Sequence, residues 1–158
     1  MKIFHNIAPA GDEVLLLGGF VQLPAPIDPR ANGFAFYVTD LSGTQMFIRR
    51  ELPAGADHWS RSLNKRLWTY VDPTGSVGGV TKVSIISIPL RGPNYYKVSV
   101  RGRKGNFMLP TSTLPINLAI VMGGPEQAIQ GMCATRQFNP PGFTSPICRM
   151  VGTILVCR

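Results

Sequence analysis

Apolar and polar residues alternate over short stretches of this chain, and the alternation is clearest in residues 95–101. Tyr96, Val98 and Val100 fall on one side of that stretch, whereas the other side is polar apart from Tyr95. Successive side chains of a β-strand point to opposite faces of its sheet. The pattern therefore predicts a strand with one buried face, which is typical of an antiparallel sheet.

Similar stretches recur along the whole chain, separated by turn-forming residues such as the run Pro73 to Gly79. The 17 glycines and 14 prolines are spread out and leave few windows long enough for a helix. We expect short helical turns at residues 57–65 and 125–129. We expect strands at residues 2–7, 13–23, 33–39, 45–50, 67–72, 80–88, 95–101, 115–122, 132–138 and 153–157.

About ten short strands predict an all-β fold, an antiparallel β-sandwich that is Ig-like or jelly-roll-like. Residues 14–23 are apolar on both faces and should form a central strand, with a bulge or bend at Gly18 and Gly19. We expect one domain over residues 1–158. Within it, residues 1–11 are expected to be a detachable N-terminal strand, because residues 8–11 resemble a hinge.

The composition is that of a folded and basic domain. Hydrophobic residues make up 44% of the chain and charged residues 15%, which excludes a disordered chain. A net charge of +8 favours acidic partners, such as an anionic polysaccharide or a nucleic acid. Residues 1–10 lack the apolar stretch of a secretory signal, and no apolar run reaches the roughly 18 residues of a membrane span. We therefore expect a mature form or an excised piece.

The strongest basic patch is formed by Arg101, Arg103 and Lys104, which glycines flank. We expect an exposed hairpin tip there, a charged loop that keeps a sheet edge soluble. The alternative is that this tip binds phosphate or sulfate groups, helped by the basic pairs at 65–66 and 49–50. The aromatic rings expected to offer stacking planes are those of Tyr95, Tyr96, Trp59 and Trp68.

Candidate catalytic and metal-binding residues are few. The chain has two histidines, His5 and His58, and no Cys-x-x-Cys pair that would hold zinc. His58 is followed by Ser60, but neighbouring loop residues seldom align as nucleophile and base. Most of the carboxylates stand where turns begin, as in Asp28, Asp40 and Asp72. The sequence therefore predicts a protein that is not an enzyme and has no metal or cofactor.

All three cysteines, Cys133, Cys148 and Cys157, lie in the last 26 residues. A hairpin about residues 151–153 would bring Cys148 and Cys157 opposite each other, at the separation of a cross-strand disulfide. Pairing of Cys133 with either of them remains an alternative, and one thiol is left over in each case. A disulfide favours an extracellular or periplasmic location, with a reduced cytosolic protein as the competing interpretation.

Several landmarks together resemble a module of predicted secreted bacterial proteins whose role is uncharacterised. The landmarks are Leu67-Trp68-Thr69-Tyr70, Gly79-Val80-Thr81-Lys82-Val83, residues 97–102 and the ending from Cys148 to Arg158. The resemblance covers the chain from about Leu15 onward and implies an extracellular or periplasmic β-sandwich, often present in several copies. The chain departs from the module's usual pattern around Cys133.

These observations predict a non-catalytic extracellular structural or adhesive module. It would act on a partner protein or on itself, as a homo-oligomer or filament, by adding strands at exposed sheet edges. The alternative is a module that binds a polyanion or carbohydrate through the basic tip and the nearby aromatic rings. An enzyme built around His58 is a third and weaker hypothesis.

Overall fold

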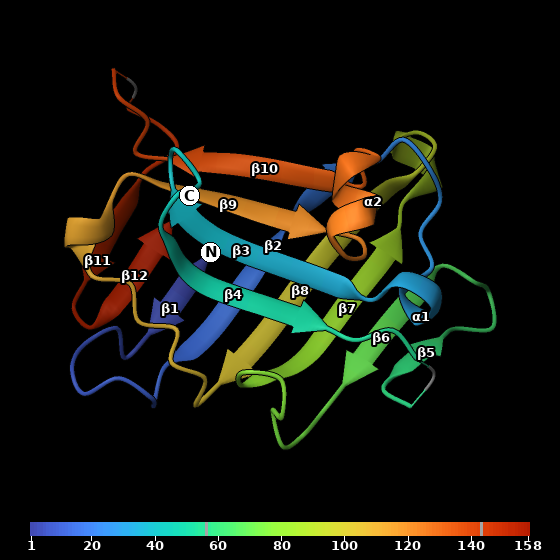
Figure 1. The fold of residues 1–158 in the computed structure, drawn as a ribbon, viewed down its shortest axis with the longest axis horizontal. Helices are drawn as coiled ribbons and strands as arrows, with labels where there is room; N and C mark the ends of the chain where they lie inside the picture. The colour runs from blue at the N-terminus through green and yellow to red at the C-terminus, as the bar shows by residue number, and fades with distance from the viewer. Residues whose placement is uncertain (56, 143) are drawn as a thin grey trace.

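The computed structural model describes residues 1–55, 57–142 and 144–158, and its two antiparallel sheets pack face to face (Figure 1). The prediction of an all-β sandwich is confirmed. The larger sheet has the order β11-β12-β1-β2-β8-β7-β6-β5. Its strands are β1 (Lys2–Phe4), β2 (Val14–Gln22), β5 (Trp59–Arg61), β6 (Leu67–Val71), β7 (Val80–Ser87), β8 (Tyr95–Arg103), β11 (Cys148–Val151) and β12 (Ile154–Cys157).

The smaller sheet crosses in front of the larger one in Figure 1 and has the order β10-β9-β3-β4. Its strands are β3 (Phe34–Asp40), β4 (Met46–Leu52), β9 (Ile116–Val121) and β10 (Cys133–Phe138). The inward residues of both sheets form one core, in which the largest completely buried side chains are Trp59, Tyr70, Phe34 and Phe36. Alternation within each strand places these apolar residues between the sheets and leaves the polar residues outside.

Each of the ten predicted stretches contains a strand, but two further strands, β5 and β11, were not predicted as separate elements. The helical turn expected at residues 57–65 is wrong, because Trp59 to Arg61 pairs with β6. The turn expected at 125–129 is confirmed as α2 (Pro125–Ile129). The remaining short helical segments are α1 (Pro29–Asn32), η1 (Pro89–Arg91) and η2 (Thr111–Thr113).

Strand β2 is central, as predicted, and lies between β1 and β8. It pairs with β8 over nine consecutive residues without a register shift, so the bulge expected at Gly18 and Gly19 is absent. Gly18 lies opposite Ser99 on the outer face, and Gly19 lies opposite Val98 on the inner face. At these two positions the strand therefore has no side chain on its outer face or on its inner face.

The N-terminal strand is shorter than predicted and is fully integrated in the larger sheet. It ends at Phe4 because His5 adopts a positive φ of 53°, and Ile3 is completely buried between β2 and β12. The Asn6 side chain donates to the carbonyl oxygen of Leu109 at 2.8 Å and accepts from its N–H at 2.7 Å. Exchange of residues 1–11 with another copy stays a prediction.

The disulfide joins Cys148 to Cys157 across the β11–β12 hairpin, the first of the three pairings considered. Cys133 is left as a half-buried free thiol. Within the described residues, no helix is long and apolar enough to cross a membrane.

Candidate functional site

The outer face of the larger sheet carries a row of six paired positions, one from each of six strands, and four of them hold basic side chains. Residues directly opposite each other in an antiparallel sheet share a face, so the pairing register identifies the members of the row. Neighbouring strands lie about 4.8 Å apart, which makes the row about 24 Å long. We call it the basic row, and in spatial order it consists of Arg149, Val156, Lys2, Leu16, Arg101 and Lys82.

Two further cations, Lys97 and Arg103, point outward from β8 on either side of Arg101. None of the strands β1, β2, β7, β8, β11 and β12 contains an Asp or Glu residue. The positive field of this face is therefore not cancelled by carboxylates on the same strands. We call the basic row together with Lys97 and Arg103 the basic face.

A row of small side chains runs beside the basic row. Directly paired positions from β2 to β5 place Gly18, Ser99, Ser84, Thr69 and Ser60 in line across the sheet. Because these side chains are short, an extended polymer can approach the sheet closely between the longer side chains on either side. Ser60 is thus part of this row, and its hydroxyl donates to the carbonyl oxygen of Thr69.

An aromatic cluster lies next to the basic face at the far end of β8. The rings of Phe20 and Tyr95 stack with centroids 6.0 Å apart and planes inclined by 29°. The guanidinium carbon of Arg91 lies 4.9 Å from the Phe20 centroid and 5.7 Å from that of Tyr95, in cation–π geometry. Phe20 is 51% exposed, so this cluster presents an accessible ring beside positive charge.

The predicted basic patch is not a hairpin tip. Arg101 and Arg103 belong to β8, and the chain passes from Lys104 to a strand of the other sheet. The flanking glycines allow close packing rather than a tight turn: a Cβ at Gly105 would lie 2.3 Å from the carbonyl oxygen of Gly78. Arg101 and Arg103 nevertheless lie on the basic face.

Three of the four predicted stacking rings are buried. Trp59, Trp68 and Tyr96 are 1%, 5% and 7% exposed, so their faces are not open to a ligand. Trp59 donates its indole N–H to the carbonyl oxygen of Pro53 at 3.0 Å, and the guanidinium of Arg61 lies over Trp68. Of the predicted rings, Tyr95 alone lies in the aromatic cluster at the surface.

The basic pairs at 49–50 and 65–66 lie away from the basic face. Arg49 forms an ion pair of 2.9 Å with Glu51 on the smaller sheet, where the Tyr37 hydroxyl also donates to Glu51 at 2.7 Å. Partial burial, and then the hydrogen bond to Glu51, raise the pKa of Tyr37 to about 12. Hydrogen bonds from Arg49 and then Tyr37 lower the pKa of Glu51. On the outer face of the smaller sheet, the charge of Arg49 is therefore neutralised by Glu51.

Arg50 has a structural role. Its guanidinium lies over the Phe107 ring at 5.0 Å and donates to the carbonyl oxygens of Gly78, Gly105 and Asn106. Partial burial lowers the pKa of Arg50. The side chain ties β4 of the smaller sheet to two loops of the larger sheet.

The residues considered for catalysis are scattered. His5 lies 3.6 Å from Asp12 in an exposed pair, whereas the His58 ring packs against Tyr70 with centroids 5.5 Å apart. In the described ranges, no three His, Cys, Asp or Glu side chains are grouped as metal ligands would be. The buried Asp72 accepts hydrogen bonds from the Ser76 and Thr74 hydroxyls, which lower its pKa and fix a turn.

Sequence reasoning missed most members of the basic face. The alternation of β8 places Arg101 and Arg103 outside and, by the same rule, places Tyr96 inside with Val98 and Val100. Lys2, Lys82 and Arg149 join them only through the order of the strands, for which the sequence has no local signal. Comparison with protein-family models, curated proteins and solved structures gave no match, so the function is argued from this face.

Proposed function

We propose that this chain is a non-catalytic extracellular adhesive module that binds an anionic polysaccharide on its basic face. One observation carries the proposal: six cationic side chains gather on strands that hold no carboxylate. Neutralising the charges of a polyanion releases its condensed counterions, which drives binding without a specific pocket. The proposed ligand is therefore recognised first by its charge.

The shape of the face suits a linear polymer. The basic row extends about 24 Å across the sheet, a length that repeated acidic sugars can follow. The row of small side chains beside it allows close approach to the backbone. Next to the basic face, at the Tyr95 end of β8, the exposed Phe20 ring carries negative potential on its face, which attracts the C–H groups of a sugar ring.

The disulfide supports a polysaccharide over a nucleic acid. Disulfides such as Cys148–Cys157 persist in oxidising compartments, where anionic polysaccharides are common ligands and nucleic acids are not. The localisation is thus part of the proposal. An oligonucleotide is the comparison ligand in its test.

The test measures heparin binding over a range of salt concentrations. The variant Lys82→Ser/Arg101→Ser removes two cations from the basic row, and Lys65→Ser/Arg66→Ser removes two exposed cations from the β5–β6 turn. We expect the first variant to bind about tenfold more weakly and to lower the salt slope by about 1.5, because two fewer counterions are released. The second variant should bind nearly as well as the unchanged chain.

Equal weakening by the two variants would show that binding depends on net charge alone and would refute the role of the basic face. Tighter binding of oligothymidylate than of heparin at the same salt concentration would assign the face to nucleic acid instead. Circular dichroism of both variants confirms that the sandwich is intact.

A second candidate function is self-assembly as a structural subunit. It is favoured by the edges of the smaller sheet, where β10 and β4 have six and seven residues, whereas β5 and β11 at the ends of the larger sheet have three and four. Long open edges accept a strand from a neighbour through main-chain hydrogen bonds. Light scattering should then show mass increasing with concentration, and a constant monomer mass would refute this function.

A further inference from the structure

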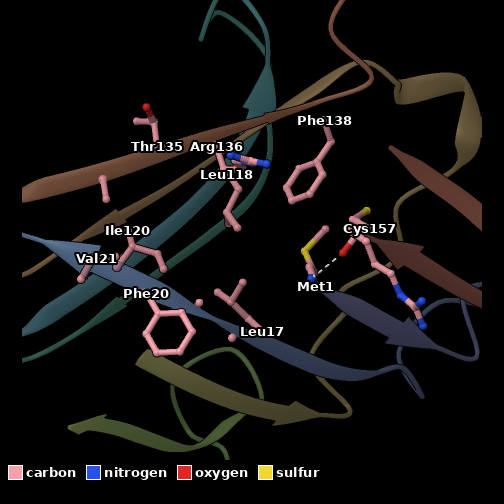
Figure 2. A pocket seen from close by; sticks show the side chains of 14 residues that line it. Met1, Leu17, Phe20, Val21, Leu118, Ile120, Thr135, Arg136, Phe138 and Cys157 are labelled. Atoms are coloured by element: carbon pink, nitrogen blue, oxygen red, sulfur yellow. Dashed lines mark hydrogen bonds between the residues drawn. The ribbon is translucent and has the colours of Figure 1, made fainter. Parts of the chain in front are cut away.

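A cleft of about 410 Å³ opens between the two sheets along the β10 side of the sandwich. Leu17 and Val21 of β2 form one wall, and Leu118 and Ile120 of β9 form the other (Figure 2). Phe138 of β10 lines it near the chain ends. These walls are apolar, and the cleft is within the size range of pockets that hold small ligands.

The floor of the cleft is open because Gly19 lies at an inward position. A Cβ added at Gly19 would meet no atom within 4 Å, although its pairing partner Val98 is completely buried. Gly19 does not have a positive φ, so the backbone itself does not require glycine there. The missing side chain therefore leaves apolar space that an occupant can fill.

Arg136 places a positive charge at the cleft. It pairs with Leu118 at an inward position of β10, and Figure 2 shows its guanidinium beside that leucine. Neither of the two ion pairs found among the described residues involves Arg136. An apolar cleft with a guanidinium at its rim is complementary to a ligand with an apolar body and an anionic head.

We propose that this cleft binds a single-chain amphiphile with a carboxylate head, of the fatty-acid class. The acyl chain lies over Gly19 between Leu17 and Ile120, and the carboxylate pairs with the guanidinium of Arg136, whose fork of donors matches two carboxylate oxygens. The cleft lies between the sheets and the basic face lies outside them. The proposal is therefore independent of polysaccharide binding.

The test is calorimetric titration of the full disulfide-bonded chain with octanoate, dodecanoate and hexadecanoate, each below its micelle-forming concentration. We expect saturable binding of at least one of these acids. Gly19→Leu should reduce the affinity at least about tenfold, because the new side chain occupies the space of the ligand. Gly18→Leu is the matched control, since the same change one residue away points to the outer face.

The anionic head is tested with Arg136→Gln. This change should weaken carboxylate binding about tenfold, as expected for loss of a hydrogen bond between charged groups, and leave the affinity for the alcohol of the same chain length unchanged. Arg149→Gln on the basic face controls for net charge. Thermal unfolding of each variant shows whether it is folded. If Gly19→Leu does not fold, Gly19→Ala replaces it, because alanine fills less of the cleft.

Four results would overturn the proposal. One is the absence of saturable binding for all three acids, and another is unchanged affinity in both Gly19 variants. The third is a chain that is dimeric by light scattering and becomes monomeric on Gly19→Leu, which would assign the cleft to a second copy. Equal affinities for acid and alcohol, unaffected by Arg136→Gln, would refute the carboxylate head.

Discussion

The two long sides of the sandwich differ in how well they are closed. On the side beneath β4, Phe34, Val83 and Ile85 are completely buried. On the side beneath β10, Leu17 and Ile120 line an open cleft. Both sides have apolar walls, so hydrophobic composition alone does not decide whether the interior is sealed.

Large side chains and one arginine close the β4 side. Trp59 packs against Tyr70 and Phe34 with ring centroids 5.4 and 6.5 Å away, and Arg50 spans from β4 to the loops of the larger sheet. The opposite side has Gly19 and Ala134 at comparable inward positions. Closure therefore depends on a few bulky residues at the seam between the sheets, and their absence leaves room for a ligand.

The largest effect is expected from Trp59→Ala. Removing a fully buried aromatic side chain should lower the free energy of unfolding by about 3–5 kcal/mol, measured by urea denaturation. Phe138→Ala, on the open side, should have a smaller effect because its ring already faces the cleft. Equal losses for the two variants would mean that the sides do not differ in packing.

The disulfide secures the hairpin at the end of the open side. Cys148→Ser/Cys157→Ser should lower stability by about 2–3 kcal/mol, because the unfolded chain is no longer constrained by a short loop. Cys133→Ser, which breaks no disulfide, is the matched control and should shift the melting temperature little. Unchanged melting of the double variant would show that pairing with β1 alone holds the hairpin.

Asp72 makes the stability of the loop at 72–79 depend on pH. Its folded pKa is lowered by the Ser76 and Thr74 hydroxyls, so this contribution is present above the unfolded pKa of about 3.9 and is lost as the pH falls. Asp72→Asn should cost about 1–2 kcal/mol at neutral pH. It should also flatten the decline of stability below about pH 4. A parallel decline in both proteins would contradict this role.

Glycines on the two sides should respond in opposite directions, and the smallest effect is expected at Gly19. Gly19→Ala should raise stability by about 0.5–1 kcal/mol, because alanine restricts the unfolded chain and meets no atom in the cleft. Gly79→Ala should lower it, since φ is +83° and a Cβ would lie 2.3 Å from Gly105. A loss of stability in Gly19→Ala would contradict the open floor.

The local pattern of apolar and polar residues was sufficient to predict the long strands, but it did not predict the short strands β5 and β11. Alternation over six or more residues revealed β8, whereas the three residues of β5 are too few to establish a period. The sequence therefore predicts Trp59 in a helical turn with an accessible ring, although it is among the largest buried side chains. The hairpin register of Cys148 and Cys157 could be foreseen, because a short turn defines which residues face each other.

The sequence by itself determined the all-β class and the outward side of each long strand, since these depend on neighbouring residues. It also indicated Cys148–Cys157 as one of three possible disulfides, and the structure selected that pairing. Only the tertiary structure brought Lys2, Lys82 and Arg149 into one row, because strand order is a property of pairing between distant segments. It also decided that Gly19 lies beneath an open cleft and Trp59 in a sealed core. The physical reason is that packing between two sheets depends on which strands face each other, and no local pattern contains that information.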